Sequence, residues 1–211
     1  LGVLTTATID AGRSAAALGD VGADVRLLGG MDDAQVAALH DIPGVAQVAT
    51  VTAASSIGLQ TGANTRVVMT LYSADAALTE VQRHVPGAVP VPAPGSIAVA
   101  APVAIGVGDT ANVASAPPTM LTVTAKPDAA PGLTTAQTWM LVDRRSLAGT
   151  TIRPVVTAAY LALADGADPV AVAAAVRGAV DPDVAVTTAQ ERLEQLRTAP
   201  TAQAMSTGIL V

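Results

Sequence analysis

The sequence predicts an α+β fold in which two β-α-β halves flank a β-rich middle. Three observations lead to this prediction. Helix and strand patterns alternate over residues 21–88, the same alternation returns over 151–198, and between them short strand signals are separated by Pro and Gly. Halves of this kind pack as a sheet covered by helices, and the middle then forms an inserted lobe.

The pattern of the first half predicts helices and strands that are bounded by Gly and Pro. In chain order we expect a helix over residues 6–18, a strand over 23–28, a short helix after residue 32 or 33, strands over 45–52 and 65–72, and a helix over about 75–85. Asp32 or Asp33 suits the N-cap of the short helix, because a carboxylate there accepts a bond from a backbone N–H group. Pro43-Gly44 and Pro86-Gly87 end the second and third helices.

The second half repeats this order. A β-branched run predicts a strand over 155–163, and Asp168 followed by Pro169 predicts the N-cap and first position of a helix. A strand over 184–187 follows, and Thr188 with Glu191 forms a capping box for a last helix. Ferredoxin-like packing is the simplest arrangement of the two halves.

The middle of the chain has short strand signals and no helix pattern. They lie at residues 97–100, 111–114, 120–125 and 139–143. Because Pro and Gly separate these runs, the segment predicts a small β-rich lobe inserted between the two halves.

Composition excludes several classes of function. The net charge is −6 and Trp139, Tyr72 and Tyr160 are the only aromatic residues, which argues against nucleic-acid binding by basic patches or base stacking. Cysteine is absent, so disulfides and thiol chemistry are excluded. The long uncharged stretches 84–108 and 44–65 are interrupted by Pro and by polar residues, so neither predicts a membrane-spanning helix.

Residues that suggest chemistry have a structural interpretation beside the functional one. His40 and His84 are compatible with metal or acid-base roles, but each stands at the end of a predicted helix next to a Pro-containing turn, where the helix dipole favours a solvated histidine. Gly106, Gly108 and Asp109 suggest a phosphate loop, yet no Lys follows, so we expect a turn between strands. No HExxH, G-x-S-x-G or P-loop motif is present, and we expect no catalytic residue, metal or cofactor.

Charged pairs and the single Trp are treated in the same way. The acidic pairs Asp32-Asp33 and Asp181 with Asp183 could bind a cation, but they stand where caps and turns favour Asp. The basic pair Arg144-Arg145 could contact an anionic headgroup or a partner, or it could be a solvated strand end. For Trp139, packing in a core or between lobes is the expected role.

Several segments together resemble one known family. They are Val21-Gly22-Ala23-Asp24-Val25-Arg26, Leu39 with Pro43-Gly44-Val45, Ala104 to Thr110, Pro131-Gly132-Leu133 with Met140 to Asp143, Asp168 to Val180, and Thr187 to Leu196 with Pro200. In this order they resemble the extracytoplasmic, MacB-like periplasmic core domain of FtsX-like ABC transporter permeases.

The resemblance implies a division of the chain and a set of partners. Residues 21–88 and 151–198 would form a porter-like α/β lobe, and 89–150 a small sabre-like β-rich lobe. Residues 1–20 would continue from a preceding membrane span and 199–211 would lead into a following one. The implied partners are the protein's own transmembrane segments, a separate cytoplasmic ABC ATPase subunit, and a lipid, lipoprotein, peptide or cell-wall-associated partner outside the membrane.

Two other readings stay open at this point. One is a secreted or anchored module that binds a ligand or peptide. The other is a hydrolase domain, which would need a convergent Ser-His-Asp site that the sequence pattern does not display. The expected function is the transmission of ATPase-driven motion, or the recognition of a substrate or partner, on the extracytoplasmic side of a cell membrane.

Overall fold

The computed structural model describes residues 2–62 and 65–198 and confirms the predicted α+β fold class. The helices are α1 (Gly2–Val21), α2 (Asp33–His40), α3 (Ala76–Val81), α4 (Pro169–Ala179) and α5 (Ala189–Thr198), with a 3-10 turn, η1 (Arg144–Leu147). The strands are β1 (Val25–Leu28), β2 (Val45–Thr61), β3 (Thr65–Ala74), β4 (Ser96–Val99), β5 (Thr110–Val113), β6 (Thr119–Ala125), β7 (Trp139–Asp143), β8 (Val155–Leu163) and β9 (Ala185–Thr188).

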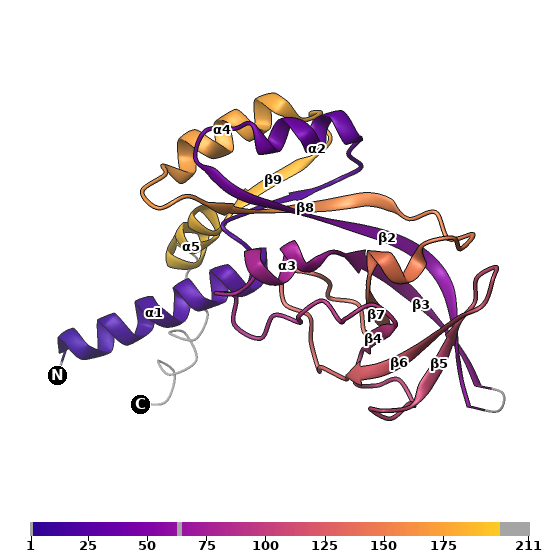
Figure 1. The fold of residues 1–211 in the computed structure, drawn as a ribbon. Coiled ribbons are helices and arrows are strands. Elements are labelled where there is room, and N and C mark those ends of the chain that lie inside the picture. The colour runs from indigo at the N-terminus through magenta and orange to yellow at the C-terminus, as the bar shows by residue number, and fades with distance from the viewer. Residues whose placement is uncertain (1, 63–64, 199–211) are drawn as a thin grey trace.

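Four strands form a ferredoxin-like sheet. Their order is β2-β8-β1-β9 and each neighbouring pair is antiparallel. Helix α2 connects β1 to β2, α4 connects β8 to β9, and both helices cover the same face of the sheet (Figure 1). Leu39 of α2 and Val176 of α4 are fully buried in the core that this packing creates. These four strands and two helices are called the ferredoxin-like part below.

A second part is built around the far half of β2. There β2 pairs with β3 and β5, and the pairings β3–β7, β7–β4, β4–β6 and β6–β5 close the sheet on itself as a small barrel. Trp139 is 1% exposed in the core of this barrel, which confirms the packing role expected for it. The ring of six strands with the loops between them is called the β-rich lobe.

Strand β2 runs through both parts and is nine residues longer than the predicted 45–52. Its register with β3 shifts between Ala54 and Ile57, and Ser56 has a φ of 61° there. An irregularity of this kind bends a strand and increases its twist. The prediction ended the strand too early because pairing with β3 and β5, and not a local apolar pattern, holds residues 53–61 in extended conformation.

Some boundaries of the first half differ from the prediction. Helix α1 is longer than 6–18, and α3 ends at Val81 although a helix to Val85 was expected. The N–H group of Arg83 donates to Glu80 and that of Val85 donates to Gln82, so tight turns replace the last helical turn. Val85 is nevertheless buried, which explains why its spacing fitted a helical stripe.

Helices α1 and α5 lie side by side at one end of the molecule, and α1 extends away from the body (Figure 1). Within residues 2–62 and 65–198, none of the helices has both the length and the apolar character that crossing a membrane requires. The expected lead into a following membrane span, 199–211, lies outside the described residues. The lobe boundaries at 88 and 150 stay a prediction.

Candidate functional site

The end of α1 is joined to the β-rich lobe by a small set of contacts. Tyr160, on β8, is fully buried, and its hydroxyl donates to the carbonyl oxygen of Gly132 at 2.6 Å. Arg26, on β1, donates from Nη1 to the carbonyl oxygen of Asp20 at 2.7 Å and to that of Gly132 at 3.5 Å. Gly22 lies against Gly132 backbone to backbone. Gly22, Arg26, Gly132 and Tyr160 are called the clasp.

The electrostatics of the clasp keep Tyr160 as a hydrogen-bond donor. Burial raises the pKa of Tyr160 to about 12, although the positive charge of Arg26 acts in the opposite direction. Burial disfavours the phenolate because a charge loses its hydration in a protein interior. Tyr160 therefore stays neutral and holds the carbonyl of Gly132 throughout the physiological pH range.

Two buried donors, one in the clasp and one beside it, lack an acceptor among the described residues. They are Nε of Arg26 and Nε2 of Gln82. The amide of Gln82 packs next to Gly22: a Cβ atom at Gly22 would lie 3.2 Å from Nε2 of Gln82. Buried donors without partners lower the stability of the arrangement that contains them. The clasp is thus tightly packed but not fully satisfied.

Helices α1 and α5 are tied together next to the clasp. Nε of Arg192 donates to Oδ2 of Asp20 at 2.8 Å, and Arg197 lies 3.8 Å from Asp10. Asp20 thus pairs with α5 through its side chain and with Arg26 of the clasp through its carbonyl oxygen. A groove of about 730 Å³ lies beside these contacts, between α1 and the loop 129–135.

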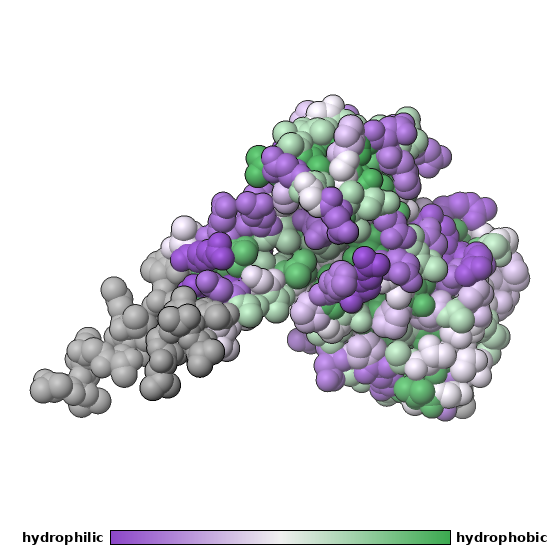
Figure 2. Space-filling view, turned by 60° about the vertical axis from the view of Figure 1, so that its left-hand side comes forward, coloured by the Kyte–Doolittle hydropathy of each residue, from purple (hydrophilic) through white to green (hydrophobic). Residues whose placement is uncertain are grey.

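The basic pair that the sequence singled out lies on the other side of the lobe junction. There a cleft of about 940 Å³ is lined by β2, the start of α2, the start of α3, η1 and the segment before β8. Arg144 Nη2 donates to the carbonyl oxygen and to Oγ1 of Thr50 on β2, at 3.0 and 2.8 Å. This space is called the interlobe cleft. In the space-filling view the two parts form separate bulges with an indentation between them (Figure 2).

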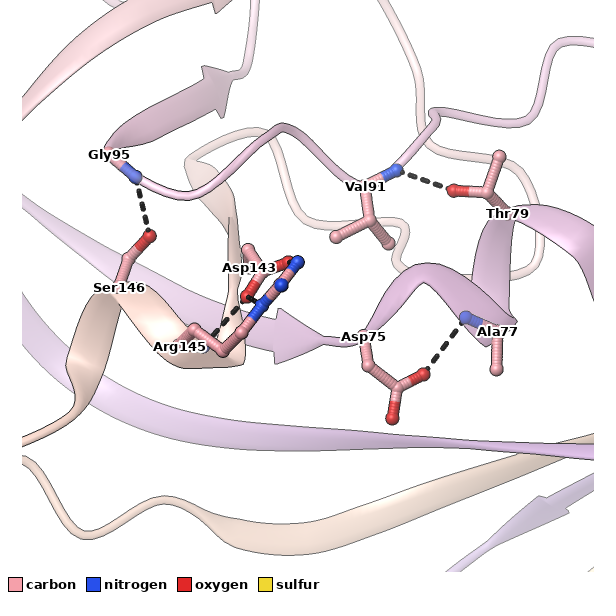
Figure 3. A network of polar contacts seen from close by, with 8 residues as sticks. All are labelled: Asp75, Ala77, Thr79, Val91, Gly95, Asp143, Arg145 and Ser146. Carbon is pink, nitrogen blue, oxygen red and sulfur yellow. Dashed lines mark hydrogen bonds and ion pairs between the residues drawn. The ribbon is translucent and has the colours of Figure 1, made fainter.

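Asp143, at the end of β7, organises one wall of the interlobe cleft. Its carboxylate caps η1 by accepting from the N–H group of Arg145, and it accepts from Nε and Nη2 of the same arginine at 2.9 and 2.8 Å (Figure 3). These bonds to the Arg145 side chain lower the pKa of Asp143, and its burial only partly opposes them. The same bonds to Asp143 raise the pKa of Arg145, and the charge of Asp75, the N-cap of α3 nearby, adds to this effect (Figure 3).

The histidines stay apart from both of these regions. His40 is exposed at the end of α2. His84 lies three residues beyond the end of α3, not at a helix end as predicted, and it accepts a bond from Nε of Arg83. Among the residues that the structure describes, no three His, Asp or Glu side chains gather as a metal site would require.

The other sequence candidates are turns and caps. Asp32, and not Asp33, caps α2, and Gln35 completes a capping box. The segment Gly106–Asp109 forms a turn in which the N–H group of Gly106 donates to the carboxylate of Asp109, and it lies between β4 and β5, which confirms the expected turn between strands. Asp181 and Asp183 are exposed in the turn before β9.

The clasp was not identified from the sequence. Gly132 entered only as part of the Pro131-Gly132-Leu133 motif, and Tyr160 only as one of three aromatic residues. The single signal for the clasp is a tyrosine within a strand that is otherwise made of Val, Thr, Ala and Leu. That signal indicates burial but does not identify the partner, which is 28 residues away in sequence.

Comparisons with known proteins agree with this fold. No family model and no curated protein sequence matches the chain. The periplasmic region of MacB from Actinobacillus actinomycetemcomitans is similar over 87% of this chain and 97% of that chain, with a TM-score of 0.56 and 9% identity. The extracellular domain of the noncanonic ABC-type transporter YknZ from Gram-positive bacteria is similar over 78% of this chain and 99% of that chain, with a TM-score of 0.49 and 11% identity.

The chain therefore shares its fold with a protein region that lies outside the cytoplasm. More particularly, it has the fold of the MacB periplasmic region, which confirms at the level of the fold the resemblance that the sequence segments indicated. An identity of 9% shows shared architecture and leaves the function to be argued from the residues of this chain.

Proposed function

We propose that this chain is the extracytoplasmic domain of an FtsX-like, ABC-type permease. In this proposal a separate cytoplasmic ATPase subunit drives motion of transmembrane segments, and α1 and α5 carry that motion to the β-rich lobe on the outer side of the membrane. The inserted segment of this lobe, residues 89–150, would act on a lipid, lipoprotein, peptide or cell-wall partner without covalent chemistry. The fold of the MacB periplasmic region supports the class of protein.

One observation carries the mechanical role. Asp20, in the last turn of α1, is bonded to α5 through Arg192 and to β1 through Arg26, and α1 ends at the clasp with Gly132. A shift of the helix pair therefore acts directly on the loop 129–135. The backbone contact between Gly22 and Gly132 leaves no soft side chain between them to absorb the shift.

Distance measurements between spin labels test this function. The chain has no cysteine, so labels at Ile9→Cys on α1 and Met120→Cys on β6 report on the helix pair and the β-rich lobe, and both sites are exposed. In the whole permease, reconstituted with its ATPase, we expect the distance distribution to change between the nucleotide-free and the vanadate-trapped states.

A control pair lies within the ferredoxin-like part. Labels at Val155→Cys and Val170→Cys, which are both exposed, should keep their distance in the two states. An unchanged distance between Ile9→Cys and Met120→Cys across the ATPase cycle would contradict the proposed transmission.

A further inference from the structure

Charged side chains of both signs line the interlobe cleft and have hydrogen-bonding positions without a protein partner. The proposed transmission of motion does not involve them. Arg144 bonds through Nη2 alone, and Arg145 bonds through Nε and Nη2, so in the described part of the chain three of their nitrogens have no protein acceptor. The carboxylate of Asp33 has no hydrogen bond to the described residues, because Asp32 caps α2. Asp75 uses Oδ1 for Ala77 and leaves Oδ2 unused.

These groups do not simply neutralise one another. Asp143 and Arg145 form the one ion pair of this wall among the described residues, at 2.8 Å. Asp33 and Asp75 form no ion pair with any described arginine, although both line the same cleft as Arg144. Two carboxylates and two guanidinium groups with free bonding positions thus surround one opening.

The floor between these charged groups is apolar. Leu147 and Ile152 are buried, and the other apolar lining residues are Ala76, Ala77, Ala148, Pro154 and Val156. A cavity of about 940 Å³ is at the upper end of the range that holds a drug-sized ligand, roughly 300 to 1,000 Å³. An apolar floor with a few convergent polar groups is the usual composition of a small-ligand site.

We propose that the interlobe cleft binds a short peptide that has a free ammonium group and a free carboxylate. Arg144 and Arg145 hold the carboxylate, Asp33 and Asp75 hold the ammonium group, and the floor takes aliphatic side chains. A guanidinium group presents parallel N–H donors that match a carboxylate, and the rim of mixed charge selects a zwitterion over a simple anion or cation. The proposal concerns binding alone and holds whether or not motion passes through the clasp.

Titration calorimetry with a defined peptide series tests it. The probe is the tetrapeptide Leu-Ala-Ala-Leu with free ends, compared with its N-acetylated, C-amidated and doubly blocked forms. Each blocked end removes one set of charge-assisted bonds, so we expect Kd to rise about tenfold for either single block and further for the double block. Equal affinity for all four peptides, or no measurable binding of any, would overturn the proposal.

Variants of the cleft separate the two ends of the ligand. Asp33→Asn should weaken the free peptide about tenfold and leave the N-acetylated form unchanged, because Asp33 serves only the ammonium end. Arg144→Gln should likewise weaken the free peptide about tenfold and leave the C-amidated form unchanged, because Arg144 serves only the carboxylate end. Asp183→Asn and Arg83→Gln change the same residue types outside the cleft and should leave every Kd unchanged. Matching unfolding midpoints for Asp33→Asn and the original chain show that the fold is kept, since Asp33 is exposed and makes no cap.

A zwitterionic lipid headgroup shares part of this chemistry, so a separate measurement tests it as the ligand. Glycerophosphoethanolamine has an ammonium group and a phosphate but no aliphatic side chains for the floor. We expect it neither to bind measurably nor to displace the tetrapeptide at equal concentration. If glycerophosphoethanolamine displaced the tetrapeptide at equal concentration, the ligand would be a lipid headgroup and the assignment of a peptide would be overturned.

Discussion

Replacing Gly132 with alanine places a methyl group against the backbone of Gly22. An ideal Cβ at Gly132 would lie 2.2 Å from Cα of Gly22, 2.7 Å from its nitrogen and 3.2 Å from the carbonyl carbon of Val21. These neighbours are backbone atoms, so no side chain can rotate away. The substitution therefore has to separate the loop 129–135 from the end of α1.

The magnitude has two contributions. Gly132 has a φ of 68°, and a non-glycine residue in this left-handed region is destabilised by about 1 to 2 kcal/mol. Overpacking against atoms that cannot relax adds about 1 to 3 kcal/mol. We expect the free energy of unfolding to fall by roughly 2 to 5 kcal/mol and Tm to fall by roughly 4 to 20 °C for a chain of this size.

The control for Gly132→Ala is Gly149→Ala. Gly149 has a φ of 78°, but no atom lies within 4 Å of its ideal Cβ, so that substitution has the conformational contribution alone. Urea unfolding followed by circular dichroism gives both free energies. If the two variants lose the same stability, the backbone contact between Gly22 and Gly132 is not as close as the structure shows, and the clasp argument fails.

Three further predictions concern titrating and capping groups. Tyr160 should remain unionised in an absorbance titration up to about pH 11, because burial raises its pKa to about 12, and stability should decline as the pH rises from 10 toward that value. For Asp143 the folded pKa lies below the ordinary 3.8 because Arg145 bonds to it, so its stabilising contribution is complete above pH 3.8 and is lost as the pH falls through the folded pKa. Asp143→Asn should abolish that acid dependence in unfolding curves, and an unchanged curve would refute it. Asp32→Ala should lower the free energy of unfolding by about 1 kcal/mol, whereas Asp33→Ala should change it by less than about 0.5 kcal/mol, because only Asp32 caps α2. Equal losses for these two variants would contradict the observed cap.

Local signals identified most elements of the fold. The capping box of Thr188 and Glu191 is present, with reciprocal bonds of 3.0 and 2.9 Å. Asp168 and Pro169 begin α4 as predicted, and β7 and β8 have the predicted bounds. Caps and strands of this kind depend on residues within a few positions of each other, so a single sequence is enough to find them.

The candidate site was much harder to predict than the fold. The sequence singled out the pair Arg144-Arg145, but the bonds of Arg144 to β2 depend on where that strand passes. Thr50 is 94 residues away from Arg144. A contact over that separation leaves no trace in the local pattern.

Residue periodicity, caps and turn residues decided which segments became helices and strands, because those preferences act over one or two turns of chain. Long-range packing alone decided three other features. They are the pairing of the end of β2 with β5, the pairing of β3 with β7 that helps close the barrel, and the contact of Gly22 with Gly132. Each depends on the approach of backbones that are distant in sequence, and the free energy of such an approach is set by shape and hydrogen bonding in the folded molecule. The clasp and the interlobe cleft arise from that long-range packing.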